Sequence, residues 1–150
     1  LETFAKKAWP LLQDDRNWYR TLILASFLER EVPEFEDRRI VAGLLLKRFR
    51  LDIPLQVDAT ISYAKCKSGF ADCETSIVTK NDLSIASPYN TYKRLGFTPT
   101  PIANPGEAAL KAARTPQTSP YLYYLSAAKT KETLFSKTLD EHNIKRAKYL

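Results

Sequence analysis

Two carboxylates close an otherwise apolar stretch, LILASFLERE, which runs from Leu22 to Glu31. Read as a helix that turns by about 100° per residue, this stretch places Glu29 and Glu31 on nearly opposite faces. Glu29 lies above two small residues, Ala25 and Ser26, whereas Glu31 lies above large apolar ones. Space beside a carboxylate leaves room for a ligand, so this spacing favours Glu29 as the functional residue.

A glutamate held against apolar surface keeps its proton to higher pH, because burial disfavours the charged form and raises the pKa. A carboxyl group that titrates near neutral pH is what a general acid requires. The simpler alternative is that the helix reaches the surface at Glu29, where the charge is solvated or paired with Arg30 or Arg38. Helix geometry by itself favours this simpler alternative.

Polar and aromatic residues gather in two later segments, LQVDAT and SPYNTY, with a further amide in TPIANP. Amides and hydroxyls of this kind bind sugar oxygens, and aromatic faces pack on sugar C–H groups. The alternative is that SPYNTY is an Asn-centred turn whose tyrosines pack internally. The candidate substrate-binding residues are Gln56, Asp58, Thr60, Tyr89, Asn90, Thr91 and Asn104, with Tyr92 as a further aromatic face.

Metal chemistry has little support in the sequence. Cys66 and Cys73, in CKSGFADC, would need more ligands to hold zinc, and His142 is the only histidine. A short loop closed by a disulfide is one interpretation of the two cysteines, and two free thiols are the other. We therefore expect no metal site.

The chain is basic, because 23 Lys and Arg residues against 17 Asp and Glu residues give it a net charge of +6. Such a charge favours anionic partners, which include nucleic acid, a membrane surface and an acidic cell-wall polymer. No recognisable motif supports nucleic acid, so we expect no such partner. No run of the sequence approaches the roughly 18 apolar residues of a membrane span.

Apolar periodicity and turn residues predict an α+β fold, with helices around a small antiparallel sheet, in one domain over residues 1–150. Helices are expected over residues 1–12, 17–31, 36–50, 106–114 and 138–150, and strands over 121–127 and 133–137. Thr138 and Glu141 form a predicted capping box for the last helix.

Two stretches between these elements are harder to interpret. LQVDATISYA alternates apolar and polar residues, so it is either one strand or a strand up to Val57 followed by a helix with Asp58 as its N-cap. The second interpretation is preferred. Residues 64–105 contain mostly turn residues and predict a long irregular region that forms a cleft, which is usually functional in a compact domain.

Seven motifs follow one another along the chain: LASFLERE, RIVAGLLLKRF, PLQVDAT, SPYNTY, TPIANPG, SPYLYYL and LFSKTLDEHN. From about Leu22 onward, their content and order resemble the YceG-like family of endolytic murein transglycosylases. The chain departs from the family at two places. The family usually has Asp-Pro-Thr where this chain has Asp58-Ala59-Thr60, and often Gly-Leu-Pro-Pro-Gly-Pro-Ile where it has GFTPTPI.

The resemblance implies a lytic transglycosylase that cuts peptidoglycan glycan strands outside the cytoplasmic membrane. The family's catalytic glutamate lies in a segment similar to LASFLERE, and the matching position here is Glu29. This residue would protonate the glycosidic oxygen and then, as a carboxylate, accept the proton of the muramic sugar's primary hydroxyl, which leaves an anhydromuramic end. The reaction requires no cofactor. The motif DEHN also resembles the family, although a capping or surface role is favoured for its His142.

The resemblance also implies that the chain is a catalytic fragment. The family's amino-terminal anchor and LysM-like portion do not match any part of it, so contact with the membrane would come from a segment outside this chain. The expected partners are glycan strands, and cell-wall synthases are further candidates.

Two other functions stay open. A hydrolase acting on the same glycan would use water as the nucleophile and need a second carboxylate, for which Asp58 is the candidate. A glycan-binding module without turnover would bind its ligand whether or not Glu29 is intact.

Overall fold

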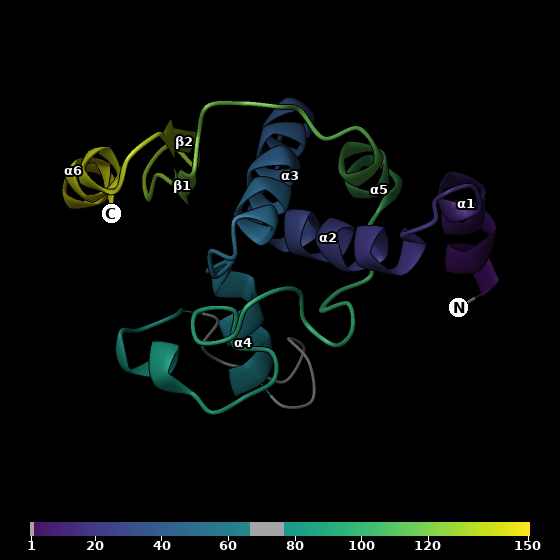
Figure 1. Cartoon of the computed structure of the whole chain (residues 1–150), viewed down its shortest axis with the longest axis horizontal. Coiled ribbons are helices and arrows are strands. Elements are labelled where there is room, and N and C mark those ends of the chain that lie inside the picture. The colour runs from purple at the N-terminus through teal and green to yellow at the C-terminus, as the bar shows by residue number, and fades with distance from the viewer. Residues whose placement is uncertain (1, 67–76) are drawn as a thin grey trace.

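The computed structural model describes residues 2–66 and 77–150. The helices there are α1 (Glu2–Leu12), α2 (Trp18–Glu31), α3 (Phe35–Arg50), α4 (Asp58–Lys65), α5 (Glu107–Arg114) and α6 (Leu139–Tyr149), with a 3-10 turn, η2, over Asn81–Ser84. Strands β1 (Tyr123–Ser126) and β2 (Thr133–Ser136) form an antiparallel hairpin. The predicted α+β class is confirmed. Figure 1 shows α1 and α6 at opposite ends of the long axis, with α2 and α3 between them.

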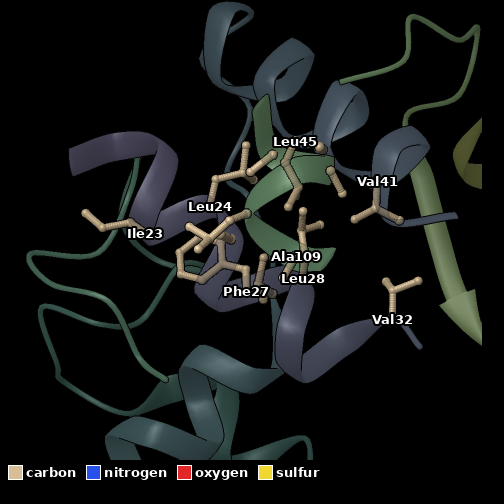
Figure 2. Close-up of a cluster of buried hydrophobic side chains, with 14 of the residues drawn as sticks. Ile23, Leu24, Phe27, Leu28, Val32, Val41, Leu45 and Ala109 are labelled. Carbon is tan, nitrogen blue, oxygen red and sulfur yellow. The ribbon is translucent and has the colours of Figure 1, made fainter. Parts of the chain in front are cut away.

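The hydrophobic core is built around α2, which is buried without a break from Ile23 to Leu28. Its apolar side chains pack against α3 and α5, and Figure 2 shows Phe27, Leu28 and Ala109 of α5 in one buried cluster. Phe27 is fully buried. Replacing such a residue with alanine costs about 3–5 kcal/mol. The core therefore holds the carboxyl-terminal end of α2 in one place, and that end carries both glutamates.

The segment between α5 and β1 passes across α3 and leads into the hairpin (Figure 1). The hairpin contacts the end of α2, because its Tyr124 bonds Glu31. The backbone N–H of Gln117 donates to the carbonyl oxygen of Arg39 (2.9 Å), and Lys47 Nζ donates to the carbonyl oxygen of Tyr121 (2.8 Å). A Cβ atom at Gly43 would lie 2.0 Å from the Gln117 oxygen, so this crossing requires glycine.

The segment before α4 corrects one prediction. Residues 53–57 form no strand, and neither the continuous strand nor the short one exists. Their alternating pattern finds no partner strand; instead the Gln56 N–H donates to the Thr91 carbonyl oxygen (3.1 Å), and Gln56 adopts a positive φ of 55°. The predicted helix is present, but its N-cap is Val57 and Asp58 is its first residue.

Other elements follow the sequence more closely. α1 continues through Pro10 to its end at Leu12. In α6, Thr138 Oγ1 accepts from the Glu141 N–H (3.2 Å), which confirms the cap, although the Glu141 carboxylate accepts from the N–H of Lys137 rather than that of Thr138. Residues 77–106 contain η2 and otherwise irregular backbone.

The two cysteines differ in what the structure describes. Cys66 is buried at the C-cap of α4, whereas Cys73 lies outside the described residues. Cys66 is disulfide-bonded, which favours the disulfide-closed loop over two free thiols. Within residues 2–66 and 77–150, no helix has the length and apolar character needed to cross a membrane.

Candidate active site

Glu31, the last residue of α2, receives hydrogen bonds from two other elements. Its Oε1 accepts from the backbone N–H of Ala59 in the first turn of α4 (2.7 Å). Its Oε2 accepts from the hydroxyl of Tyr124 in β1 (2.9 Å). Three segments far apart in the sequence therefore meet at this one carboxylate.

The environment of Glu31 raises its pKa from 4.5 to about 7. Burial is the larger cause, and the negative charge of Asp58 is the second. The N–H of Ala59, the hydroxyl of Tyr124 and the charge of Arg30 act in the opposite direction but offset only part of the rise. Glu31 is therefore present in both protonation states near neutral pH, as a group that must act as acid and base requires.

Asp58 lies beside Glu31 and has its own phenol partner. The hydroxyl of Tyr92 donates a hydrogen bond to Asp58 Oδ1. Burial first, and then the neighbouring Asp58 charge, raise the pKa of Tyr92 well above its usual range. Tyr92 therefore stays a neutral donor, and the site contains two carboxylates that each accept from a tyrosine.

Glu29, the predicted catalytic residue, points elsewhere. Its Oε2 accepts from the backbone N–H of Gly106, the N-cap of α5 (3.0 Å), and lies 3.8 Å from Arg38 Nη1. Arg38 in turn donates from Nε to the Val32 carbonyl oxygen (2.6 Å). These contacts tie α2, α3 and α5 together. The catalytic role of Glu29 stays a prediction, and the surroundings of Glu31 suit acid–base chemistry better.

The space expected beside Glu29 is occupied by a distant loop. Ser26 Oγ accepts from the N–H of Ile102 (3.1 Å), and Gly106 follows four residues later against Glu29. The small residues of α2 therefore make room for the segment that leads into α5. The prediction that Glu29 and Glu31 face opposite sides is consistent with all of these contacts.

Three of the predicted binding residues are buried and hold the backbone. Thr91 Oγ1 accepts from the N–H of Val57 (3.0 Å) and lies 2.9 Å from Thr60 Oγ1. Asn90 Nδ2 donates to the carbonyl oxygen of Ile85 (2.8 Å), and its Oδ1 accepts from the Tyr92 N–H (2.9 Å). This network fixes the SPYNTY segment against the start of α4.

The other predicted binding residues are separated. Gln56 is exposed and lies two residues before Asp58. Tyr89 packs on Tyr63, with ring centroids 4.8 Å apart, and its hydroxyl lies 2.7 Å from Thr100 Oγ1. Asn104 is exposed in the loop before α5, two residues before Gly106, whose N–H bonds Glu29. The structure thus brings Asp58 and Tyr92 near Glu31, whereas the side chain of Gln56 bonds Arg48.

Tyr124 and Arg48 were not among the predicted site residues. Tyr124 belongs to the predicted strand over residues 121–127, which indicated only a hairpin, yet its hydroxyl donates to Glu31. Arg48 belongs to the predicted helix over residues 36–50, yet it is 5% exposed and donates to Gln56 Oε1 (2.8 Å). A basic residue in the apolar half of the α3 periodicity was the one available signal.

His142 is not a simple surface or capping residue. Its ring stacks on Tyr123 at 5.2 Å between centroids, and its buried Nδ1 has no hydrogen-bond partner in the described part of the chain. Burial first, followed by the cations Arg146, Arg48 and Lys145, lowers its pKa. Across residues 2–66 and 77–150, no group of three or more His, Cys, Asp or Glu side chains could hold a metal ion.

The sequence profile of the YceG-like family matches residues 1–148. The chain belongs to this family. It is 42% identical to an endolytic murein transglycosylase of Bacillus subtilis over 132 residues, which cover 88% of this chain. It is 30% identical to an endolytic murein transglycosylase of Streptococcus pneumoniae over 122 residues, which cover 81% of this chain.

A solved structure supports the fold of this YceG-like chain. The crystal structure of a YceG-like protein from Listeria monocytogenes superimposes with a TM-score of 0.80 at 38% sequence identity and covers 95% of this chain. The matched regions are parts of longer proteins. The chain spans 35% and 22% of the two named transglycosylases and 45% of the Listeria protein.

Proposed function

We propose that this chain carries the catalytic site of a peptidoglycan lytic transglycosylase and that Glu31 is its single acid–base residue. Family membership and the names of the two relatives support the substrate class and the reaction. The observation that carries the choice of residue is the position of Glu31, whose carboxylate accepts from the Ala59 N–H (2.7 Å) and the Tyr124 hydroxyl (2.9 Å). Burial and the charge of Asp58 raise its pKa to about 7, which agrees with this choice.

In this mechanism the protonated Glu31 gives its proton to the glycosidic oxygen between the muramic acid and glucosamine sugars as that bond breaks. The resulting carboxylate then accepts the proton of the muramic sugar's primary hydroxyl, and the oxygen of that hydroxyl closes on the anomeric carbon. Glu31 gives one proton to the glycosidic oxygen and accepts one from the hydroxyl, so it ends protonated as it began. Because the internal hydroxyl replaces water, one carboxyl group is sufficient, unlike in common glycosidases.

The neighbours of Glu31 would divide the remaining tasks. The N–H of Ala59 and the hydroxyl of Tyr124 stabilise the carboxylate between the two proton transfers. The negative charge of Asp58 favours the protonated starting state. The same charge would stabilise the positive charge that develops on the sugar ring as the bond breaks. Asp58 then acts electrostatically and needs no covalent role.

The place of action follows from the substrate. Peptidoglycan lies outside the cytoplasmic membrane, so we propose that the protein works there, held by a segment outside this chain. Cell-wall synthases that supply new glycan strands are proposed partners. The net charge of +6 suits a polymer that carries lactyl and peptide carboxylates.

The test is mass spectrometry of purified peptidoglycan after incubation with the unmodified protein, with Glu31→Gln and, as the matched control, with Glu29→Gln. We expect anhydromuramic ends from the unmodified protein and from Glu29→Gln. Glu31→Gln should lower the rate about 10²–10⁴-fold, the usual range for removal of a general acid–base group.

Each contrary result points to a specific alternative. Loss of product with Glu29→Gln and retention with Glu31→Gln would return the catalytic role to Glu29. Reducing muramic ends would indicate a hydrolase, with Asp58 as its second carboxylate. Binding of strands with no product from the unmodified protein would indicate a glycan-binding module.

A further inference from the structure

Gln56 has a backbone conformation that glutamine rarely adopts. Its φ is 55°, in the left-handed region that costs most L-residues about 1–2 kcal/mol and that glycine adopts freely. The conformation is held by its N–H, which donates to the Thr91 carbonyl oxygen (3.1 Å). Strained residues cluster at functional sites, and this one lies two residues before Asp58 with its side chain exposed.

Arg48 fixes the orientation of the Gln56 amide. Arg48 is 5% exposed, and its guanidinium donates to the carbonyl oxygens of Pro54 (3.0 Å) and Leu122 (2.9 Å) and to Gln56 Oε1 (2.8 Å). The guanidinium also lies over the ring of Tyr123, 5.2 Å from its centroid. Since arginine has donors and no acceptor, the oxygen of the amide must face it.

The orientation leaves the NH2 end of Gln56 facing away from Arg48. No residue in the described part of the chain accepts a hydrogen bond from this Nε2. The amide therefore presents two N–H donors two residues before Asp58, the first residue of α4. The negative charge of Asp58 so near in the chain disfavours an anionic ligand group, so a neutral acceptor fits best.

We propose that Gln56 donates through Nε2 to the acetamido carbonyl oxygen of an N-acetylated sugar, with Arg48 as the positioning residue that fixes the amide. The proposal rests on the function proposed above for the class of ligand. An acetamido oxygen is the strongest neutral acceptor that such a glycan offers. A glycine at this position would relieve the backbone but remove the donor, which explains why glutamine is used there.

The test replaces the NH2 donor of Gln56 and keeps the oxygen that Arg48 bonds. Gln56→Glu keeps the side-chain length and offers Arg48 an oxygen as before, but it presents an acceptor where the NH2 group was. The second variant, Arg48→Lys, keeps the charge but lacks the planar fork that fixes the amide. Lys47→Gln is the matched control. Lys47 donates to the carbonyl oxygens of Ser119 and Tyr121, next to the Leu122 oxygen that Arg48 bonds, and has no hydrogen bond with Gln56.

Binding to insoluble peptidoglycan is measured by co-sedimentation, with all proteins carrying Glu31→Gln so that the strands are not cut. We expect Gln56→Glu to bind N-acetylated strands about tenfold more weakly, as loss of one good hydrogen bond predicts. The affinity of Arg48→Lys should lie between those of Gln56→Glu and the parent, and the affinity of Lys47→Gln should equal that of the parent. On de-N-acetylated strands the difference between parent and Gln56→Glu should disappear or reverse, because the carboxylate attracts the new ammonium groups.

Two results would overturn the proposal: equal binding of the parent and Gln56→Glu to N-acetylated strands, or the same tenfold difference on de-N-acetylated strands. Failure of the parent to bind at all would overturn it as well. A protein that binds as expected but, with Glu31 restored, forms no anhydromuramic ends would instead contradict the proposed lytic reaction. The two failures are therefore distinguishable.

Discussion

The two faces at the carboxyl-terminal end of α2 each carry a glutamate, and the two glutamates have opposite electrostatic surroundings. On one side, Glu29 faces Arg38 and the N–H of Gly106, so its negative charge has a cation and a helix N-terminus as partners. On the other side, Glu31 faces a second carboxylate, Asp58, and two neutral donors. One glutamate stabilises the packing of three helices, and the other is held in a field that opposes its charge.

In the function proposed above, this difference separates a structural carboxylate, Glu29, from a catalytic one, Glu31. A charge that is matched by its surroundings contributes to folding. A charge that is poorly matched costs folding free energy but titrates at a useful pH. The comparison therefore predicts opposite effects on stability and activity when each glutamate is neutralised, and four measurements test it.

The largest effect is expected for Glu31→Gln on stability. The folded pKa of Glu31 is about 7 against 4.5 for the free side chain, so the folded state binds the extra proton between these values. The free energy of unfolding should fall as pH rises through this window, by up to about 3 kcal/mol, and stay low above it. Because Gln cannot ionise, the variant should be more stable than the parent at pH 8, although its rate should be about 10²–10⁴-fold lower.

Urea unfolding of both proteins from pH 4 to pH 8 measures this difference. The gap should close below about pH 4.5, where the side chain is protonated in both states. Tyr124 can still bond the amide, since its hydroxyl accepts as well as donates. A gap that is constant with pH would contradict the raised pKa and with it the choice of Glu31.

The second effect is a loss of stability on the Glu29 side. Glu29→Ala removes the acceptor for the Gly106 N–H and the partner of Arg38, so it should cost about 1–2 kcal/mol at neutral pH. The activity per folded molecule should change little. Glu36→Gln is the control, because its ion pair with Arg39 is exposed and should contribute under about 1 kcal/mol. Inactive but stable Glu29→Ala would reverse the assignment of the two residues.

The sequence favoured Glu29 through the small residues below it and through the family motif, whereas the contacts that favour Glu31 come from remote parts of the chain. The periodicity of α2 correctly predicted that the two glutamates face different sides. It could not show that Glu31 would receive hydrogen bonds from residues 28 and 93 positions later in the chain. The small residues below Glu29 suggested free space, but the loop around Ile102 fills it.

Elements with strong local signals were predicted well, and those that depend on partners were not. The long helices follow apolar spacing of 3.6 residues, and the hairpin follows from two β-rich runs around a polar turn. The alternation up to Val57 has the period of a strand, but a strand also needs a neighbour to pair with. Here Thr91 bonds that backbone instead, through its carbonyl and its hydroxyl.

The third prediction concerns the charge that opposes Glu31. Asp58→Asn removes the negative charge that raises the pKa of Glu31, so that pKa should fall. The Glu31-dependent limb of the pH–rate profile should move to lower pH by about one unit or less. Asp52→Asn is the control, since Asp52 is an exposed carboxylate outside the Glu31 network, and asparagine tolerates its positive φ. An unmoved limb would show that Asp58 does not act on the group that limits the rate.

The smallest effect should come from Tyr124, with the opposite sign. Its hydroxyl donates to Glu31 Oε2 and lowers the pKa of that carboxyl, so Tyr124→Phe should raise the pKa and move the same limb to higher pH by about half a unit. The ring stays in place, so the fold should be kept, and Tyr121→Phe serves as a hairpin control. Opposite shifts for Asp58→Asn and Tyr124→Phe would identify Glu31 as the titrating group, because Asp58 raises the pKa of that carboxyl and Tyr124 lowers it. Shifts in the same direction would contradict this, since a general loosening of the site moves the limb one way whichever neighbour is removed.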